Sequence, residues 1–323
     1  LETPNYKIRL WGNNMSSTPS ELLLSWLLGR LPDAPKGWFE SQLSKIKDDP
    51  TKKAFDMCFA MVPRRLGKDD LALSTDELAA ADASRAGWSP RYWSIDVAAR
   101  IYLLIEISND NTVPFVERFK QLHRTADVGE LLALYNGLPL YTKPEVLVGL
   151  AADGLRTNIK AEFQAVSHQN PFPAEQFSEN PWNNMILKAL FIGVMLEPIL
   201  GIDKRANPEL ARILRDYAHE RWAADRFVSP ELWRCIGPFA EGVFLDDFQK
   251  VIDHGNDTEK KAVALALVSA PPSEGKNKLC VQLAEFDAAL AQNELTWATI
   301  ADEMLDNSLA VTRKMNFEVE LKR

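Results

Sequence analysis

The sequence predicts an all-α protein made of helix pairs, arranged as a HEAT-like or α-solenoid-type array that curves to the right or to the left. Three observations predict this class. Apolar residues recur at helical spacing along most of the chain, sustained alternating runs typical of strands are nearly absent, and the prolines stand mostly between the periodic segments. Helices that bury one apolar stripe against a neighbour produce this pattern.

The first third of the chain predicts several helices in succession. Thr18 or Ser17 is expected to cap the first helix, with Pro19 in its first turn and leucines forming a stripe behind it. Further helices are expected over 38–46, 52–66 and 74–86. Ser89-Pro90 is expected to open a long helix that runs through residue 107, and the polar run at 109–111 ends it.

From about residue 112 the predicted helices come in pairs. One covers 113–122, and Asp127 caps the next. Pro144 opens a long helix to residue 163, with apolar residues every fourth position at 147, 151, 155, 159 and 163. The segment 182–200 is apolar on most sides, and within it the run 189–196 reads as a buried core helix. Asn207-Pro208 caps and opens a helix to about residue 225.

The segment 244–270 resembles one HEAT repeat. A helix over 244–253 is followed by a tight turn and a helix that Asp257 caps and that ends near residue 269. Two more helices and a charged tail follow. We therefore divide the chain into an N-terminal extension (1–16), an N-terminal helical region (17–111), a HEAT-like core (112–272) and C-terminal helices with a tail (273–323), all parts of one continuous helical fold.

Composition excludes several classes of function. The formal net charge of −8 argues against nucleic-acid binding, which needs clustered Lys and Arg. The three cysteines are far apart, so we expect neither a disulfide framework nor a zinc site. The longest apolar run has eight residues, too few to span a bilayer, and the first 14 residues lack the apolar region of a signal peptide. We expect a cytoplasmic protein, and whether residues 1–14 are native stays open.

Tests for catalytic motifs fail. His219-Glu220 begins like a helical zinc-protease motif, but Ala223 stands where the second histidine is needed. Asp246-Asp247 resembles the magnesium motif of helical prenyl-chain enzymes, but Lys250 replaces the required carboxylate. Phosphate-binding loops, nucleophile elbows and dinucleotide fingerprints are absent from the sequence. We therefore expect no metal and no cofactor, name no catalytic residue, and leave open whether the protein is an enzyme.

Polar residues on apolar helices between 156 and 234 are the candidates for a binding site. Lys188 lies one turn after Asn184, and Arg221 falls near the apolar face of its helix, whereas His219 falls on the opposite, solvated face. Lys188 and Arg221 either form ion pairs, for example with Glu197 or Glu220, or line an anion-binding pocket. The walls of such a pocket would be Trp182, Trp222 and Trp233. The full set of candidate ligand-binding residues is Asn158, Asn183, Asn184, Lys188, Arg205, His219, Glu220 and Arg221.

Six blocks of the sequence carry a resemblance to a known family. They are FKQLHRTAD (119–127), NNMILKALFIG (183–193), RANPELA (205–211), DYAHERWA (216–223), SPELW (229–233) and GPFA (237–240). Together they resemble the EboA family of bacterial proteins over roughly residues 90–270. The resemblance implies a role beside enzymes that make or export a small, prenylated or cyclitol-like metabolite. It implies no reaction for this member, and Asn207 keeps its separate expected role as a helix cap.

Two hypotheses follow. The first is a non-catalytic scaffold or metabolite-binding protein, whose partners would be proteins of the same pathway or a small anionic metabolite. The second is an enzyme that acts on an anionic intermediate in an interhelical pocket around Lys188 and Arg221. Neither nucleic acid nor a membrane span is expected, and the oligomeric state cannot be read from the sequence.

Overall fold

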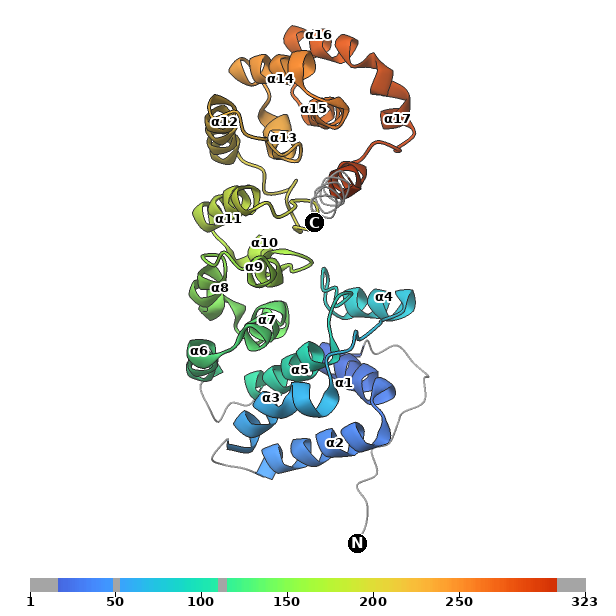
Figure 1. Ribbon diagram of the computed structural model, residues 1–323, viewed down its shortest axis with the longest axis vertical. Helices are drawn as coiled ribbons and strands as arrows, with labels where there is room; N and C mark the ends of the chain where they lie inside the picture. Colours follow the sequence, from blue (N-terminus) through green and yellow to red (C-terminus); the bar gives the residue numbers. More distant parts are fainter. Residues whose placement is uncertain (1–16, 49–52, 110–114, 307–323) are drawn as a thin grey trace, which may run out of the picture. The chain divides into compact units, whose positions relative to one another are not determined.

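The computed structural model of the chain describes residues 17–48, 53–109 and 115–306 (Figure 1). The expected all-α class is confirmed. The described residues form α-helices and short 3-10 helices but no β-strand, and their only β-type pairings are two isolated bridges, Asp70 with Ser94 and His168 with Ile199. None of the helices in these ranges combines the length and the hydropathy that crossing a bilayer requires.

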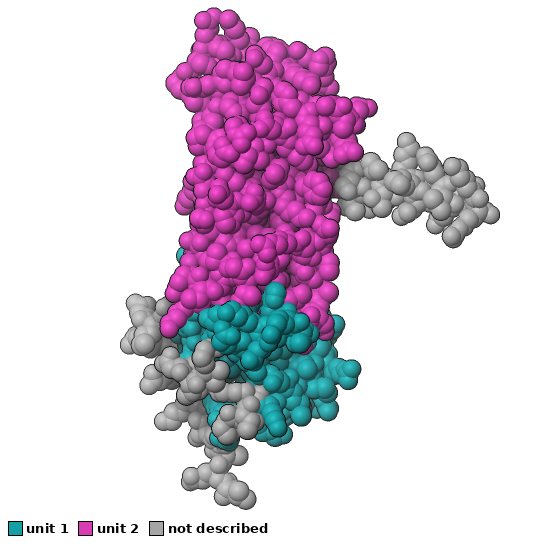
Figure 2. Space-filling model, turned by 90° about the vertical axis from the view of Figure 1, so that its left-hand side faces the viewer, with its two compact units in different colours: residues 1–125, 140–142 teal, residues 126–139, 143–323 magenta. Residues whose placement is uncertain are grey.

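The chain divides into two compact units, which Figure 2 shows in teal and magenta. Unit 1 takes in residues 1–125 and 140–142, and unit 2 takes in residues 126–139 and 143–323. The four segments proposed from the sequence, with boundaries at 16, 111 and 272, stay a prediction.

Unit 1 is built around one long, almost fully buried helix. Its helices are α1 (Pro19–Arg30), α2 (Asp33–Asp48), α3 (Lys53–Leu66), α4 (Thr75–Ser84), α5 (Ile95–Asn109) and α6 (Phe115–Thr125). Helix α5 packs against α1 and α3 and buries residues on every side. Inside it, the buried guanidinium of Arg100 donates to the carbonyl of Phe59 at 3.1 Å and lies 3.5 Å from the carboxylate of Asp96. A buried charge requires such partners.

Unit 2 contains the remaining elements. They are α7 (Val128–Asn136), η2 (Pro144–Leu147), α8 (Val148–Gly154), α9 (Lys160–Ser167), α10 (Phe172–Gln176), α11 (Glu179–Ile192), α12 (Pro208–Ala223), α13 (Leu232–Ile236), η3 (Gly237–Phe239), α14 (Val243–His254), α15 (Asp257–Ser269), α16 (Glu274–Gln282), η4 (Ala284–Phe286), α17 (Asp287–Ala291) and a helical segment over 297–306. The turn η1 (Leu138–Leu140) follows α7. Contacts join mainly elements that are close in the chain, such as α7 with α9, α11 with α12, and α13 and α14 with α15. The HEAT-like arrangement itself stays a prediction.

Most of the predicted helix starts are confirmed. Thr18, Asp127 and Asn207 each accept a backbone N–H of the first turn of the helix that follows, and Pro19 and Pro208 occupy first-turn positions. Other starts differ. The cap before α15 is Asn256 instead of Asp257, and α5 begins at Ile95, five residues after the proline expected to open it. Helix α2 begins at Asp33 and α11 at Glu179, five and three residues before the starts expected at 38 and 182.

The long helix predicted over 144–163 is wrong. The chain forms η2 and α8, leaves the helix after Gly154, and starts again with α9 at Lys160. Gly154 lies so close to α7 that an added Cβ would stand 2.6 Å from the ring of Tyr135. Ile159, expected in the apolar ladder, is instead 46% exposed, and its N–H bonds to the hydroxyl of Thr157 at 3.0 Å. Tertiary packing therefore overrides the continuous helical pattern.

The helix predicted over 182–200 is also too long. Helix α11 ends at Ile192 because Gly193 adopts the left-handed conformation (φ 66°, ψ 47°) that terminates many helices. The apolar run 189–196 thus spans a helix end instead of a core helix. Within it Ala189 and Leu196 are buried, but Phe191 is 68% exposed.

Candidate functional site

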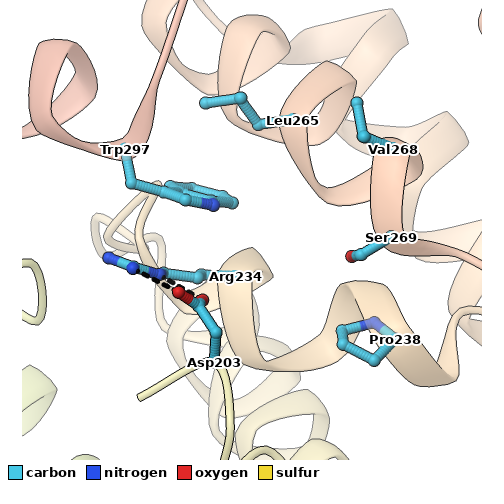
Figure 3. Close-up of a pocket in the computed structure, with 7 residues that line it drawn as sticks. All are labelled: Asp203, Arg234, Pro238, Leu265, Val268, Ser269 and Trp297. Carbon is cyan, nitrogen blue, oxygen red and sulfur yellow. Dashed lines mark hydrogen bonds and ion pairs between the residues drawn. The ribbon is translucent and has the colours of Figure 1, made fainter. Parts of the chain in front are cut away.

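A pocket of about 260 Å³ opens in unit 2 between α13, η3, α15 and the segment that begins the last described helix (Figure 3). It is small for a ligand pocket, whose usual volumes begin near 300 Å³. Figure 3 shows the indole of Trp297 lying across the side chain of Arg234, with Pro238 and Ser269 on the opposite side. The lining residues are Asp203, Arg234, Pro238, Leu265, Val268, Ser269 and Trp297.

The floor of the pocket depends on a close approach of η3 to α15. A Cβ added to Gly237 would stand 2.5 Å from the carbonyl oxygen of Ala266 and 2.6 Å from the hydroxyl of Ser269. Only glycine fits this contact without displacing backbone. The close approach at Gly237 places Pro238 beside the end of α15. There the Ser269 hydroxyl donates a hydrogen bond to the Ala266 carbonyl at 2.9 Å.

One wall of the pocket is an ion pair. Arg234 donates from Nε to Asp203 Oδ1 at 2.6 Å and from Nη2 to Asp203 Oδ2 at 2.7 Å, a two-pronged geometry that holds both groups in place. The Arg234 side chain is only 12% exposed. Burial lowers the pKa of Arg234, but the hydrogen bonds and charge of Asp203 more than offset this effect, so its pKa is raised. The guanidinium therefore stays charged at any physiological pH.

One nitrogen of the Arg234 guanidinium makes no hydrogen bond within the described part of the chain. Its Nη1 is buried and finds no hydrogen-bond partner among the described residues. The guanidinium carbon lies 5.7 Å from the centre of the Trp297 ring, within cation–π distance. Trp297, Leu265 and Val268 supply apolar surface, while Asp203, Arg234 and Ser269 supply polar groups. This combination suits a small molecule with an apolar part and hydrogen-bonding oxygens.

Helix α13, which carries Arg234, is anchored by a buried carboxylate. Glu231, directly before the helix, accepts the backbone N–H of Leu196 at 2.9 Å and that of Glu197 at 2.7 Å. Burial raises the pKa of Glu231, and the two hydrogen bonds counteract part of that effect. Glu231 thereby connects the chain segment after α11 to the start of α13.

The predicted residues Asn183 and Arg205 take part in one cluster next to α11. The side-chain amides of Asn183 and Asn207 bond to each other in both directions, at 2.8 and 3.2 Å. Arg205 donates to the carbonyls of Pro173 and Ala174 and lies 4.6 Å from the ring centre of Trp182. Asn207 also caps α12, as expected. These contacts tie α10, α11 and α12 together.

His219 lies in a different cluster, between α12 and α14. Its Nε2 is 2.7 Å from Oδ1 of Asp247, and Arg215 donates to the other oxygen of the same carboxylate at 2.6 Å. Asp247 is buried and His219 is half-exposed. Trp222 lies beside the imidazole, and the ammonium of Lys250 stands 4.0 Å from the centre of the Trp222 ring. His219 is thus exposed, as its helical spacing predicted, and it also contacts a buried residue of α14.

Lys188 and Arg221 do not meet in one cluster. Lys188 Nζ donates to Asn158 Oδ1 at 2.7 Å, whereas Arg221 donates to the carbonyl of Phe227 at 2.9 Å and lies over the ring of Tyr217. Neither forms an ion pair with a residue in the described ranges, so the ion pairs proposed with Glu197 and Glu220 are not seen there. The other two candidates, Asn184 and Glu220, are exposed.

Sequence reasoning missed most of the pocket. Its residues come from positions 203, 234–238, 265–269 and 297, which no local spacing connects. Of the three tryptophans proposed as walls, Trp222 and Trp233 stack on each other with ring centres 5.8 Å apart, and Trp182 is fully buried under Arg205. A tryptophan at the start of a helix, such as Trp297, carries no sequence signal that separates it from a core residue.

Comparisons with known proteins give one match. The family model described as "Metabolite traffic protein EboA" matches residues 19–237, which confirms the resemblance found in the sequence blocks. The matched range includes Asp203 and Arg234 of the pocket but ends before Leu265 and Trp297. No curated protein and no solved structure matches the chain.

Proposed function

The chain belongs to the EboA family of metabolite traffic proteins, and from this premise we propose that it binds a small metabolite and passes it on without transforming it. The observation that carries the proposal is the pocket around Arg234 and Trp297. It offers apolar surface next to a buried guanidinium, and none of its lining residues forms a nucleophile–base pair.

The residues that line the pocket indicate which kind of ligand it can bind. An apolar portion would pack against Trp297, Leu265 and Val268, and hydroxyl or carbonyl oxygens would meet Ser269 and the Asp203–Arg234 pair. An acceptor that reached Nη1 of Arg234 would supply its missing partner. A small cyclitol-like or prenylated compound fits this combination. The predicted HEAT-like array would present such a cargo to proteins of the same pathway.

Native mass spectrometry of the protein purified gently from its own host tests the proposal. We expect a small molecule to remain bound to the wild type, to be lost from Trp297→Ala and Val268→Glu, and to be retained by Val281→Glu. Val281 is the matched control because it is 77% exposed, lies on α16 and does not line the pocket. Equal retention by all variants, or no bound molecule in the wild type, would contradict the proposal.

The enzymatic alternative around Lys188 and Arg221 makes a different prediction. If these residues acted on an anionic intermediate, Lys188→Ala and Arg221→Ala would fold but fail to complement a deletion strain. The separate neighbours of the two side chains, Asn158 and Phe227, support the binding role over this alternative. A changed mass of the bound molecule after incubation would also favour an enzyme.

A further inference from the structure

An exposed apolar patch lies in unit 2 where the end of α11 meets the start of α9. We define the Phe191 patch by Asn158, Ile159, Lys160, Lys188 and Phe191. Phe191 is 68% exposed and Ile159 is 46% exposed. Two hydrogen bonds join the segments that carry them, from Lys188 to the side chain of Asn158 at 2.7 Å and from Lys160 to the carbonyl of Gly193 at 3.0 Å. None of the five patch residues lines the pocket.

Both lysines of the patch are held by neutral oxygens. The amide oxygen of Asn158 accepts from Lys188, and the backbone carbonyl of Gly193, at the end of α11, accepts from Lys160. Neither ammonium forms an ion pair with any residue in the described ranges. The whole chain has a formal net charge of −8, but both charged residues of this patch are lysines.

Phe191 is also oriented by its neighbour. The ammonium of Lys188 stands 5.6 Å from the centre of the Phe191 ring, within cation–π distance. The ring is therefore held at the surface while most of its area stays in contact with solvent. Exposed aromatic side chains surrounded by polar residues are typical of the centres of protein–protein interfaces.

We propose that the Phe191 patch docks a partner protein through a segment that carries carboxylates on either side of an apolar side chain. The apolar side chain covers Phe191 and Ile159, and the carboxylates reach the ammonium groups of Lys160 and Lys188. Charge complementarity selects this occupant, because the patch presents only positive charge and the partner must supply the negative charge. A lipid surface is the weaker match, since anionic membranes are recognised by clusters of four to eight basic residues.

Site-specific photocrosslinking in the native host tests the docking surface. Phe191 is replaced by the photoreactive aromatic p-benzoylphenylalanine, which keeps the ring, and the same group is placed at Val281 as the exposed control. The experiment is repeated in a Lys160→Glu/Lys188→Glu background. A Lys45→Glu/Lys47→Glu background, on exposed positions of α2, causes the same change of net charge elsewhere. Thermal melts establish that each protein is folded.

We expect an adduct at position 191, but not at 281, whose crosslinked peptide contains Asp or Glu beside an apolar residue. The Lys160→Glu/Lys188→Glu change should reduce the adduct at least tenfold, and the Lys45→Glu/Lys47→Glu change should leave it within twofold. A lipid adduct, an adduct equally abundant at 281, no adduct at 191, or an adduct insensitive to the reversal at 160 and 188 would each overturn the proposal. None of these results depends on whether the pocket holds a metabolite.

Discussion

Nε2 of His219 on α12 stands 2.7 Å from Oδ1 of Asp247 on α14, and this buried carboxylate also receives Arg215 from the preceding turn of α12. One side chain of α14 therefore clamps two positions of α12 that are four residues apart. Asp247→Ala removes both hydrogen bonds and leaves a partly buried guanidinium unpaired. We expect unfolding free energy to fall by about 2–3 kcal/mol, measured by urea denaturation.

The exposed ion pairs of Arg212, also on α12, provide the control for the hydrogen bonds of Asp247. Arg212 contacts Glu209 and Asp216 entirely at the surface. Because solvent-exposed ion pairs contribute little, Arg212→Ala should leave the denaturation midpoint almost unchanged. Equal losses for Asp247→Ala and Arg212→Ala would show that the buried carboxylate is not the element that joins α12 to α14.

The approach of η3 to α15 makes Gly237 intolerant of any side chain. A Cβ there would lie 2.5 Å from the Ala266 carbonyl, so backbone has to move. Gly237→Ala should lower unfolding free energy by about 1–3 kcal/mol and should weaken ligand retention by the neighbouring pocket. Gly149→Ala is the matched control, because nothing lies within 4 Å of its added Cβ. Thermal melts compare the two, and a harmless Gly237→Ala would refute the close packing.

His168 makes stability depend on pH. Burial lowers its pKa to about 4, and the bond between its Nε2 and the Met195 carbonyl, at 2.9 Å, counteracts only part of this effect. The unfolded chain, with an ordinary histidine pKa near 6.5, binds a proton that the folded chain excludes. This contribution is complete above about pH 6.5 and is lost as pH falls towards 4, amounting to at most about 3 kcal/mol.

The His168→Gln variant separates this effect from other titrating groups. Its denaturation midpoint should vary less between pH 7 and pH 4.5 than that of the wild type, because the difference in proton uptake at residue 168 is gone. Glutamine can still donate to the Met195 carbonyl. Parallel pH profiles for the two proteins would show that His168 does not titrate differently in the folded and unfolded states.

Glu231 should matter for the pocket although it does not line it. Glu231→Ala leaves the N–H groups of Leu196 and Glu197 without their acceptor and should cost about 3 kcal/mol. Glu231→Gln keeps one acceptor oxygen and should cost less. Because Glu231 precedes the helix that carries Arg234, both variants should also retain less ligand in native mass spectra. Glu231→Ala should lose more ligand than Glu231→Gln. If Glu231→Ala left ligand retention unchanged, Glu231 would have no role in positioning the pocket.

Sequence spacing predicted the contacts of some candidate residues but not of others. Asn207 was expected to cap α12 and does so, because a cap depends on residues three positions away. His219 is exposed, as expected, but its contact with Asp247, which lies 28 residues later, was not predicted. The sequence spacing of His219 within its own helix contains no information about a carboxylate that a second helix presents.

The breaks at Gly154 and Gly193 illustrate the same limit for helix lengths. The apolar ladder over 144–163 favours one helix, but Gly154 stands under the ring of Tyr135 on another helix and the chain turns there. Gly193 has a local reason, its left-handed conformation, and could have been read as a helix end. Missing it made Phe191 a predicted core residue instead of an exposed one.

Sequence alone determined the helical class, most helix starts and the family, because periodicity, caps and motif blocks are properties of neighbouring residues. Tertiary structure alone decided that Asp203, Arg234, Ser269 and Trp297 line one pocket and that Lys160 and Lys188 flank an exposed Phe191. Those arrangements depend on which helices pack together and where they stop. Packing between distant segments depends on many contacts at once, so it cannot be predicted from any short stretch of the sequence.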